Sequence, residues 1–211
     1  RGSVGPGGIG SEGAGRREVL EKTLAYSRMI RTVDPGAIIL GPEEWNWHGL
    51  LHSGIDKQHP VRQPDRRAHG GTDYLPWLLR ELRDAPGDRP PLDVITTHYY
   101  PQGGVFSSDV SPERQRQRDR STRAIWDPEY VDESWLRTPI ALFPALRRWV
   151  DEHYFPGTPI GLTEYNFGAD DHPNGATAQA DVLGLLGRWG VGLAARWRAP
   201  EPGSPVAEAF R

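Results

Sequence analysis

Two hydrophobic periods alternate along the chain, and the first pair lies between residues 16 and 42. After position 16, apolar residues such as Leu20 and Leu24 recur at helical spacing, which predicts a helix. The Pro-Gly pair at 35–36 ends it. Residues 37–42 are then continuously apolar, a pattern typical of a strand buried on both faces.

The same order of helix and strand repeats along the rest of the chain. Further strands are predicted over 92–100, 159–166 and 191–197, and further helices over 72–85, 138–154 (bent or started at Pro144) and 176–190. This alternation indicates an α/β fold with a parallel sheet. Polar or aromatic residues follow each strand, as in a (β/α)8 TIM-like barrel, and the glycine-rich phosphate turn of many doubly wound folds is missing.

Composition narrows the class of partner. The chain has 211 residues, a net charge of -3 and no cysteine, so it lacks a disulfide framework or a thiolate metal site. We expect neither nucleic acid nor a membrane as partner. Residues 1–15 are glycine-rich and predict a flexible N-terminal segment. Four strands amount to about half of a barrel, since a complete one takes about 250 residues.

The stretch GLTEYNFGADDH places Glu164 at the end of a predicted buried strand. A carboxylate there can simply cap a helix or pair with an arginine. It can also serve glycoside hydrolysis, which uses two carboxylates and flat surfaces for sugar rings. The aromatic candidates for such surfaces are Trp45, Trp47, Tyr99, Tyr100, Trp126 and Trp197.

Longer segments add a family resemblance. TEYNFGADDHPNGATAQADVLGLLGRWGVGLAARW, together with LDVITTHYYPQGG, RAIWDPEY and VDPGAIILGPEEWNW, resembles glycoside hydrolase family 44. These are bacterial endoglucanases and xyloglucanases with a barrel catalytic domain and a β-sandwich. The resemblance implies that residues 16–199 hold strands 5–8 of the barrel and that 200–211 are a tail or the start of the sandwich.

The resemblance also implies roles for single residues. Glu164 would be the nucleophile of a retaining mechanism, with Tyr165 and His98 fixing its carboxylate. For His98, a structural histidine bonded within the barrel is an equally good reading. Trp197 would form a sugar platform, and Trp126 and Trp45 are similar candidates.

One departure from the family matters for activity. Its acid/base glutamate lies in an Asn-Glu pair after the fourth strand, and this chain contains no such pair. Glu12 stands in a linker-like setting, and Glu43 and Glu44 suit substrate contact better than the acid role. We therefore expect a C-terminal part of the catalytic module that is inactive alone.

Three weaker signals remain. His48 and His52 have a spacing that suits zinc on a helix, but no third ligand is apparent, so we predict no metal and no cofactor. The loop of Asp170, Asp171 and Asn174 is either a solvated turn or a contact for a cation or sugar hydroxyl. The arginine-rich segment 111–123 is predicted to be a solvated loop.

The function predicted from sequence is a truncated retaining endo-β-1,4-glucanase or xyloglucanase that acts on a β-1,4-linked glucan polysaccharide and is secreted by a bacterium. Two alternatives stay open. A non-catalytic glucan-binding remnant would keep the aromatic surfaces without the acid. A metal-dependent hydrolase built on the histidines would lose activity with a chelator.

Overall fold

The computed structural model describes residues 13–211, so residues 1–12 of the predicted flexible segment lie outside the described part. The chain forms two compact units. The first runs to Ile95 and includes Arg148–Thr158. The second consists of Thr96–Arg147 and Pro159–Arg211. Strand β2 (Val94–Tyr99) and helix α7 (Leu142–His153) each contribute residues to both units.

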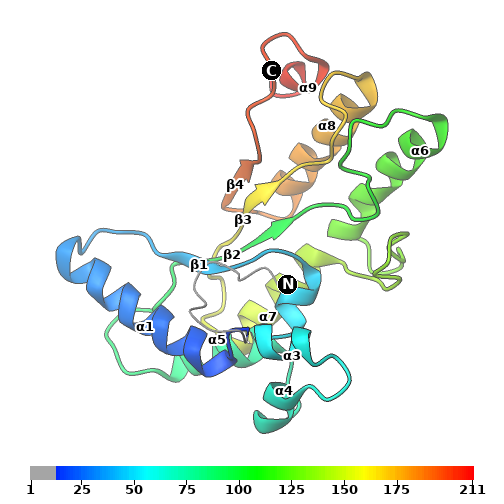
Figure 1. Cartoon of the computed structure of the whole chain (residues 1–211). Coiled ribbons are helices and arrows are strands. Elements are labelled where there is room, and N and C mark those ends of the chain that lie inside the picture. Colours follow the sequence, from blue (N-terminus) through cyan, green and yellow to red (C-terminus); the bar gives the residue numbers. More distant parts are fainter. Residues whose placement is uncertain (1–12) are drawn as a thin grey trace. The chain divides into compact units, whose positions relative to one another are not determined.

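The first unit begins with a helix, a strand and several short helices (Figure 1). Its elements are α1 (Arg16–Val33), β1 (Leu40–Glu44), α2 (Trp47–Leu51), α3 (Gly54–Gln58), α4 (Pro64–Ala68) and α5 (Tyr74–Asp84). The apolar stripe of α5 forms much of the core, with Leu75, Leu78 and Leu82 fully buried. The Tyr154 hydroxyl donates to the Leu92 carbonyl at 2.9 Å, which ties the end of α7 to the start of β2.

The second unit continues the alternation of strands and helices. Its elements are α6 (Pro112–Ser121), the 3-10 helix η1 (Thr122–Ile125), β3 (Ile160–Tyr165), α8 (Pro173–Arg188), β4 (Leu193–Arg196) and α9 (Pro205–Glu208). Helix α8 packs against both α6 and α9 (Figure 1). Val206 of α9 is fully buried, within the predicted tail 200–211.

The strands form one parallel sheet in the order β1-β2-β3-β4, as expected for part of a (β/α)8 barrel. Strands β3 and β4 pair with Gly161 opposite Leu193. Glycine at 161 suits this pairing, because a Cβ there would lie a tight 3.0 Å from the Leu193 carbonyl oxygen.

Burial of the strands differs between the middle and the ends of the sheet. Ile95 in β2 and Ile160 in β3 are fully buried, as the sequence predicted. The prediction of two-sided burial was wrong for residues 37–42, where Ile38 is 68% and Leu40 37% exposed. Leu193 of β4 is also 39% exposed. Since β1 and β4 end the sheet of described strands, their apolar side chains lack a neighbouring strand there.

The solvated loop predicted over 111–123 is instead mostly helical. Ser111 accepts a hydrogen bond from the Arg114 amide at 3.4 Å, and Pro112 opens the helix. Glu113 in the first turn and arginines in the last complement the helix dipole. Hydrophobic periodicity could not reveal α6, because its buried side chain at the centre is a charged one, Arg118.

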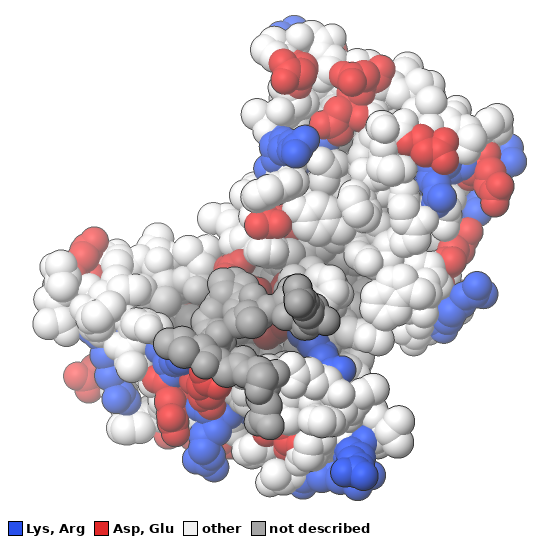
Figure 2. Space-filling view, viewed as in Figure 1, with Lys and Arg blue, Asp and Glu red and all other residues white. Residues whose placement is uncertain are grey.

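Charge on the surface is mixed in sign. On the face shown in Figure 2, basic and acidic side chains are interspersed over both units. Within residues 13–211, no helix combines the length and apolar character needed to cross a bilayer.

Candidate active site

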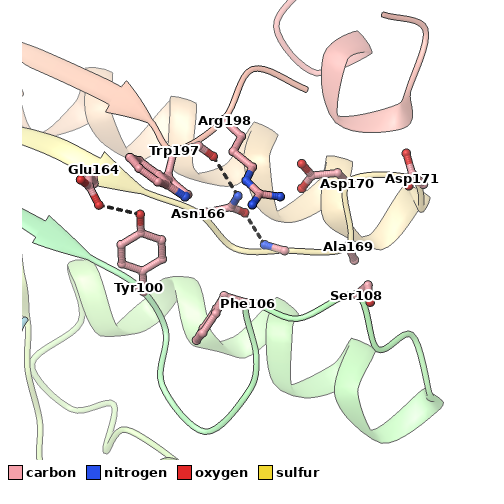
Figure 3. Close-up of a pocket in the computed structure, with 11 residues that line it drawn as sticks. Tyr100, Phe106, Ser108, Glu164, Asn166, Ala169, Asp170, Asp171, Trp197 and Arg198 are labelled. Atoms are coloured by element: carbon pink, nitrogen blue, oxygen red, sulfur yellow. Dashed lines mark hydrogen bonds between the residues drawn. The ribbon is translucent and has the colours of Figure 1, made fainter. Parts of the chain in front are cut away.

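Glu164 lies near the end of β3 with its side chain 30% exposed. The Tyr100 hydroxyl, just beyond β2, donates a hydrogen bond of 2.9 Å to Glu164 Oε2 (Figure 3). His98 Nδ1 lies 3.4 Å from the same oxygen. Two neighbouring parallel strands thus bring a phenol and an imidazole to one carboxylate.

The electrostatics of this group favour a neutral phenol. Burial raises the pKa of Tyr100, and the hydrogen bond and negative charge of Glu164 raise it further. Tyr100 therefore remains a hydrogen-bond donor throughout the neutral and mildly alkaline range. A carboxylate held by a donor in a partly exposed setting is suited to act as a nucleophile.

Tyr165 was expected to fix the Glu164 carboxylate, but in the structure this carboxylate accepts a hydrogen bond from Tyr100 instead. Successive residues of a strand point to opposite faces, so the Tyr165 ring is turned into the core. Its hydroxyl accepts a hydrogen bond of 2.9 Å from Gln179 of α8. Gln179 in turn accepts from Arg196 Nε at 3.2 Å. Tyr165 therefore anchors β3 to α8.

Arg196 closes a network at the end of β4. Its guanidinium donates to Asn166 Oδ1 at 3.1 Å and forms an ion pair with Asp170. The Asn166 amide donates to the Trp197 carbonyl at 3.1 Å and its oxygen accepts from the Gly168 amide at 2.7 Å (Figure 3). These bonds hold the chain after β3 and the chain after β4 together.

A pocket of about 620 Å³ opens beside Glu164. Trp197, 51% exposed, lines one side, and Phe106, 47% exposed, lines another. Figure 3 shows the pocket extending from Glu164 past these rings toward Asp171. Exposed rings beside carboxylates and amides match the needs of a sugar, which has apolar ring faces and polar hydroxyls.

Comparison with known proteins identifies this arrangement. Residues 9–103 match the sequence model of glycoside hydrolase family 44. The solved structure of CelM2, a bifunctional glucanase-xylanase from a metagenome library, is 48% identical over 96% of this chain, with a TM-score of 0.92. A family 44 xyloglucanase from Paenibacillus polymyxa is 26% identical over 93% of the chain, with a TM-score of 0.79. These findings support a fragment of a family 44 glycoside hydrolase with part of a (β/α)8 barrel.

A relative found by sequence is named as an endoglucanase. Endoglucanase A from Paenibacillus lautus is 29% identical over 92% of this chain. The chain spans 29% of that protein and 40% of CelM2. The resemblance drawn from the sequence is therefore confirmed, as is its restriction to a part of the family's full length.

Two of the remaining aromatic candidates lie in the interior. Trp47 is 9% exposed and stacks on Trp149 with ring centroids 5.6 Å apart. Tyr99 is 3% exposed and packs at 6.0 Å against Phe167. Packing accounts for both rings, and we leave them, with Tyr165, out of the binding surface proposed below.

Trp45 and Trp126 are more accessible but do not line the pocket. Trp45 is 57% exposed in the first unit, and Lys57 Nζ lies 5.8 Å from its ring centroid. Trp126 is half-buried in the second unit beneath the Arg188 guanidinium, at 5.8 Å. Their role as sugar contacts stays a prediction.

Other candidates of the first unit have structural partners. Glu44 lies 3.6 Å from Lys57, and burial raises its pKa. His48 and His52 meet edge to face at 5.7 Å, and burial lowers the pKa of each imidazole. Among the described residues, no group of three potential ligands gathers as a metal site.

Several pocket residues escaped the sequence analysis. Phe106, Ser108 and Arg198 line the pocket without belonging to a recognisable motif. Phe106 follows two glycines with left-handed backbone, Gly103 and Gly104, in a loop directly after a strand. An aromatic residue in such a loop is the one sequence signal that could have identified Phe106. For Asp170 and Asp171 the sequence left open a solvated turn or a contact for a cation or sugar hydroxyl, and both residues line the pocket.

Proposed function

We propose that this chain carries the nucleophile side of a retaining endo-β-1,4-glucanase or xyloglucanase. The main support is the position of Glu164, which contacts Tyr100 and His98 at the edge of a pocket with aromatic walls. The family supports the proposal, since relatives are described as an endoglucanase, a xyloglucanase and a glucanase-xylanase. A β-1,4-linked glucan is the proposed substrate, and its polymeric nature places the proposed site of action outside the cell.

The geometry suits the first chemical step. Glu164 would attack the anomeric carbon of the sugar unit beside Trp197 and form a covalent glycosyl-enzyme. As the carboxylate becomes an ester, the Tyr100 hydroxyl stays within reach of the same oxygen. A general acid must protonate the departing sugar oxygen. In retaining enzymes the carboxyl group of this acid lies about 5 to 5.5 Å from that of the nucleophile.

That acid is not supplied by an Asn-Glu pair of this chain, which has none. We propose that it comes from upstream barrel strands of the kind that the longer relatives contain. The chain preceded by such strands is called the extended enzyme below. If no upstream acid exists, the alternative of a glucan-binding protein without hydrolysis holds.

The test is reducing-sugar release from xyloglucan and carboxymethylcellulose. We compare this chain, the extended enzyme, and the extended enzyme with Glu164→Gln. Only the extended enzyme should release sugar, and the substitution should lower its kcat by at least about a thousandfold, since the covalent step is lost. Glu201→Gln, at an exposed carboxylate, is the matched control. Full activity of Glu164→Gln would disprove the nucleophile assignment.

A further inference from the structure

Arg118 of α6 is fully buried, and its guanidinium donates hydrogen bonds to backbone carbonyls and to one side-chain amide oxygen. Nε and Nη2 donate to the Val105 carbonyl at 3.1 and 2.8 Å, and Nε also donates to the Phe167 carbonyl at 2.8 Å. Nη2 reaches the carbonyls of Ser107 and Asp109 at 2.9 and 3.0 Å. Nη1 donates to Asn174 Oδ1 at 2.6 Å.

Burying a guanidinium that has no carboxylate partner among residues 13–211 is costly, and here burial lowers the pKa of Arg118. The fork of five N–H groups is what makes the arrangement workable, because each carbonyl receives a charge-assisted hydrogen bond. Lysine has three donors on one atom and cannot reach all of these acceptors. The position therefore requires arginine for its shape as well as its charge.

The backbone acceptors belong to two loops that both line the pocket. Val105, Ser107 and Asp109 alternate along the loop after β2 with the pocket residues Phe106 and Ser108. Phe167, on the loop after β3, precedes pocket residues 168–171. The Arg118 side chain thus fixes the backbone of both loops.

The two loops also touch directly. The Ala169 amide donates to the Ser107 carbonyl at 3.1 Å. Gly168 has a φ of +78°, and a Cβ there would lie 2.4 Å from the Phe106 carbonyl carbon. Only glycine allows this approach. The position of Phe106 is therefore set by neighbouring backbone, while its ring remains 47% exposed to the pocket.

We propose that Arg118 is a positioning residue that holds Phe106 and Ser108 as one wall of a preformed subsite for a further neutral sugar unit, beyond the unit beside Glu164. The ring face of this sugar packs on Phe106. Its hydroxyls meet Ser108, Asp170 and Asp171, which line the same end of the pocket (Figure 3). The proposal rests on the proposed function, since it extends the same cleft.

The experiment measures binding and turnover separately in the extended enzyme. Cellotetraose and cellobiose affinities are determined by calorimetry on the Glu164→Gln background, and kcat on an aryl β-cellobioside is measured with Glu164 intact. Arg118→Lys and Phe106→Ala should each weaken cellotetraose binding about tenfold or more. Cellobiose affinity and kcat should fall by a clearly smaller factor than cellotetraose affinity; some loss is expected because the Phe106 ring also packs on Tyr100 at 5.8 Å. Arg116→Lys, at an exposed position of the same helix, is the matched control.

Hydrogen exchange distinguishes the positioning role from general stability. In Arg118→Lys, the amides of residues 105–109 and 167–170 should exchange faster, whereas Phe106→Ala should leave them protected. A folded Arg118→Lys protein with unchanged protection and affinity would overturn the proposal. A parallel fall in affinity for both sugars and in kcat would overturn it as well, because the effect would then be general.

Two further results are decisive. If Arg118→Lys does not fold, Asn174→Ala removes a single acceptor and should weaken cellotetraose binding about threefold; no change would contradict the positioning role. If the extended enzyme cleaves glucan but Phe106→Ala binds cellotetraose normally, the subsite is wrong and the proposed function stands. If the extended enzyme neither binds nor cleaves glucan, both fall.

Discussion

At the scale of single residues, the hydroxyl of Tyr100 is the group that the structure places on the Glu164 carboxylate. It lies 64 positions away in sequence, on the neighbouring strand's loop. Because the phenol is partly buried beside a negative charge, its pKa is raised and it keeps its proton. Two predictions concern this scale.

Tyr100→Phe in the extended enzyme should lower kcat about tenfold, because losing one hydrogen bond to a charged group costs about 1.5 kcal/mol. Since the raised pKa keeps the wild-type phenol protonated, the alkaline limb of activity should be the same in both proteins up to about pH 10. Initial rates from pH 5 to 10 check this. A limb that disappears in the variant would mean that Tyr100 itself titrates there.

Trp197 and Trp47 should respond in opposite ways to truncation. Trp197→Ala removes an exposed ring from the pocket and should raise KM for xyloglucan about tenfold with little change in thermal stability. Trp47→Ala removes a ring stacked on Trp149 and should cost about 3–5 kcal/mol of stability. Steady-state kinetics and denaturant unfolding measure the two effects. If Trp47→Ala raised KM at unchanged stability, its assignment to the core would be wrong.

At the scale of elements, the first unit depends on polar links between the ends of its helices and strands. Asp93, just before β2, accepts hydrogen bonds of 2.7 Å from Arg31 of α1 and from the Ile39 amide before β1. Burial acts to raise the pKa of Asp93, but these donors outweigh it and the pKa is lowered. One carboxylate therefore connects three successive elements.

Asp93→Asn should destabilise the extended enzyme by about 1–3 kcal/mol at pH 7, since it weakens charge-assisted hydrogen bonds. A lowered folded-state pKa means that the wild-type contribution is complete above the ordinary carboxyl pKa of about 3.9 and is lost as pH falls through the folded value. The stability difference should therefore shrink in acid. Urea unfolding at pH 7 and below pH 4 measures it, with exposed Asp88→Asn as control. A difference that grows in acid would contradict the assignment.

The positions of strands and helices were predicted correctly where packing against other elements on both sides sets the hydrophobic pattern. β2 and β3 lie within their predicted ranges, and α5 lies within 72–85. Helix α6 was missed because its stability comes from capping, charge placement and a buried arginine, none of which produces an apolar period. The short helices α2, α3 and α4 were missed because five residues are too few to show one.

At the scale of the whole molecule, apolar side chains remain exposed at several elements of this chain. Tyr26, Met29, Ile30 and Val33 follow helical spacing on α1 and are 39–85% exposed. Leu40 on the first strand of the sheet, β1, and Leu193 on the last, β4, are also exposed. In a closed barrel every strand has two neighbours.

We therefore expect the 211-residue chain alone to self-associate, and the extended enzyme to be monodisperse, in size-exclusion chromatography with light scattering. Leu193→Lys should reduce the aggregated fraction of the chain, since a charge on an end strand opposes edge pairing. Ala199→Lys, exposed beyond β4, is the control for added charge. A monodisperse, cooperatively unfolding chain would contradict this expectation.

Local pattern alone determined the α/β class, the two central strands and the place of Glu164 at a strand end, because periodicity and strand termini are properties of neighbouring residues. The family came from the resemblance of longer segments, which the comparisons support. Packing between distant segments decided the rest. The partner of Glu164 is Tyr100 rather than Tyr165, Trp47 is buried while Trp197 is open, and a polar helix turns Arg118 inward. These outcomes depend on which side chains meet across the sheet and loops, and sequence neighbours do not encode that.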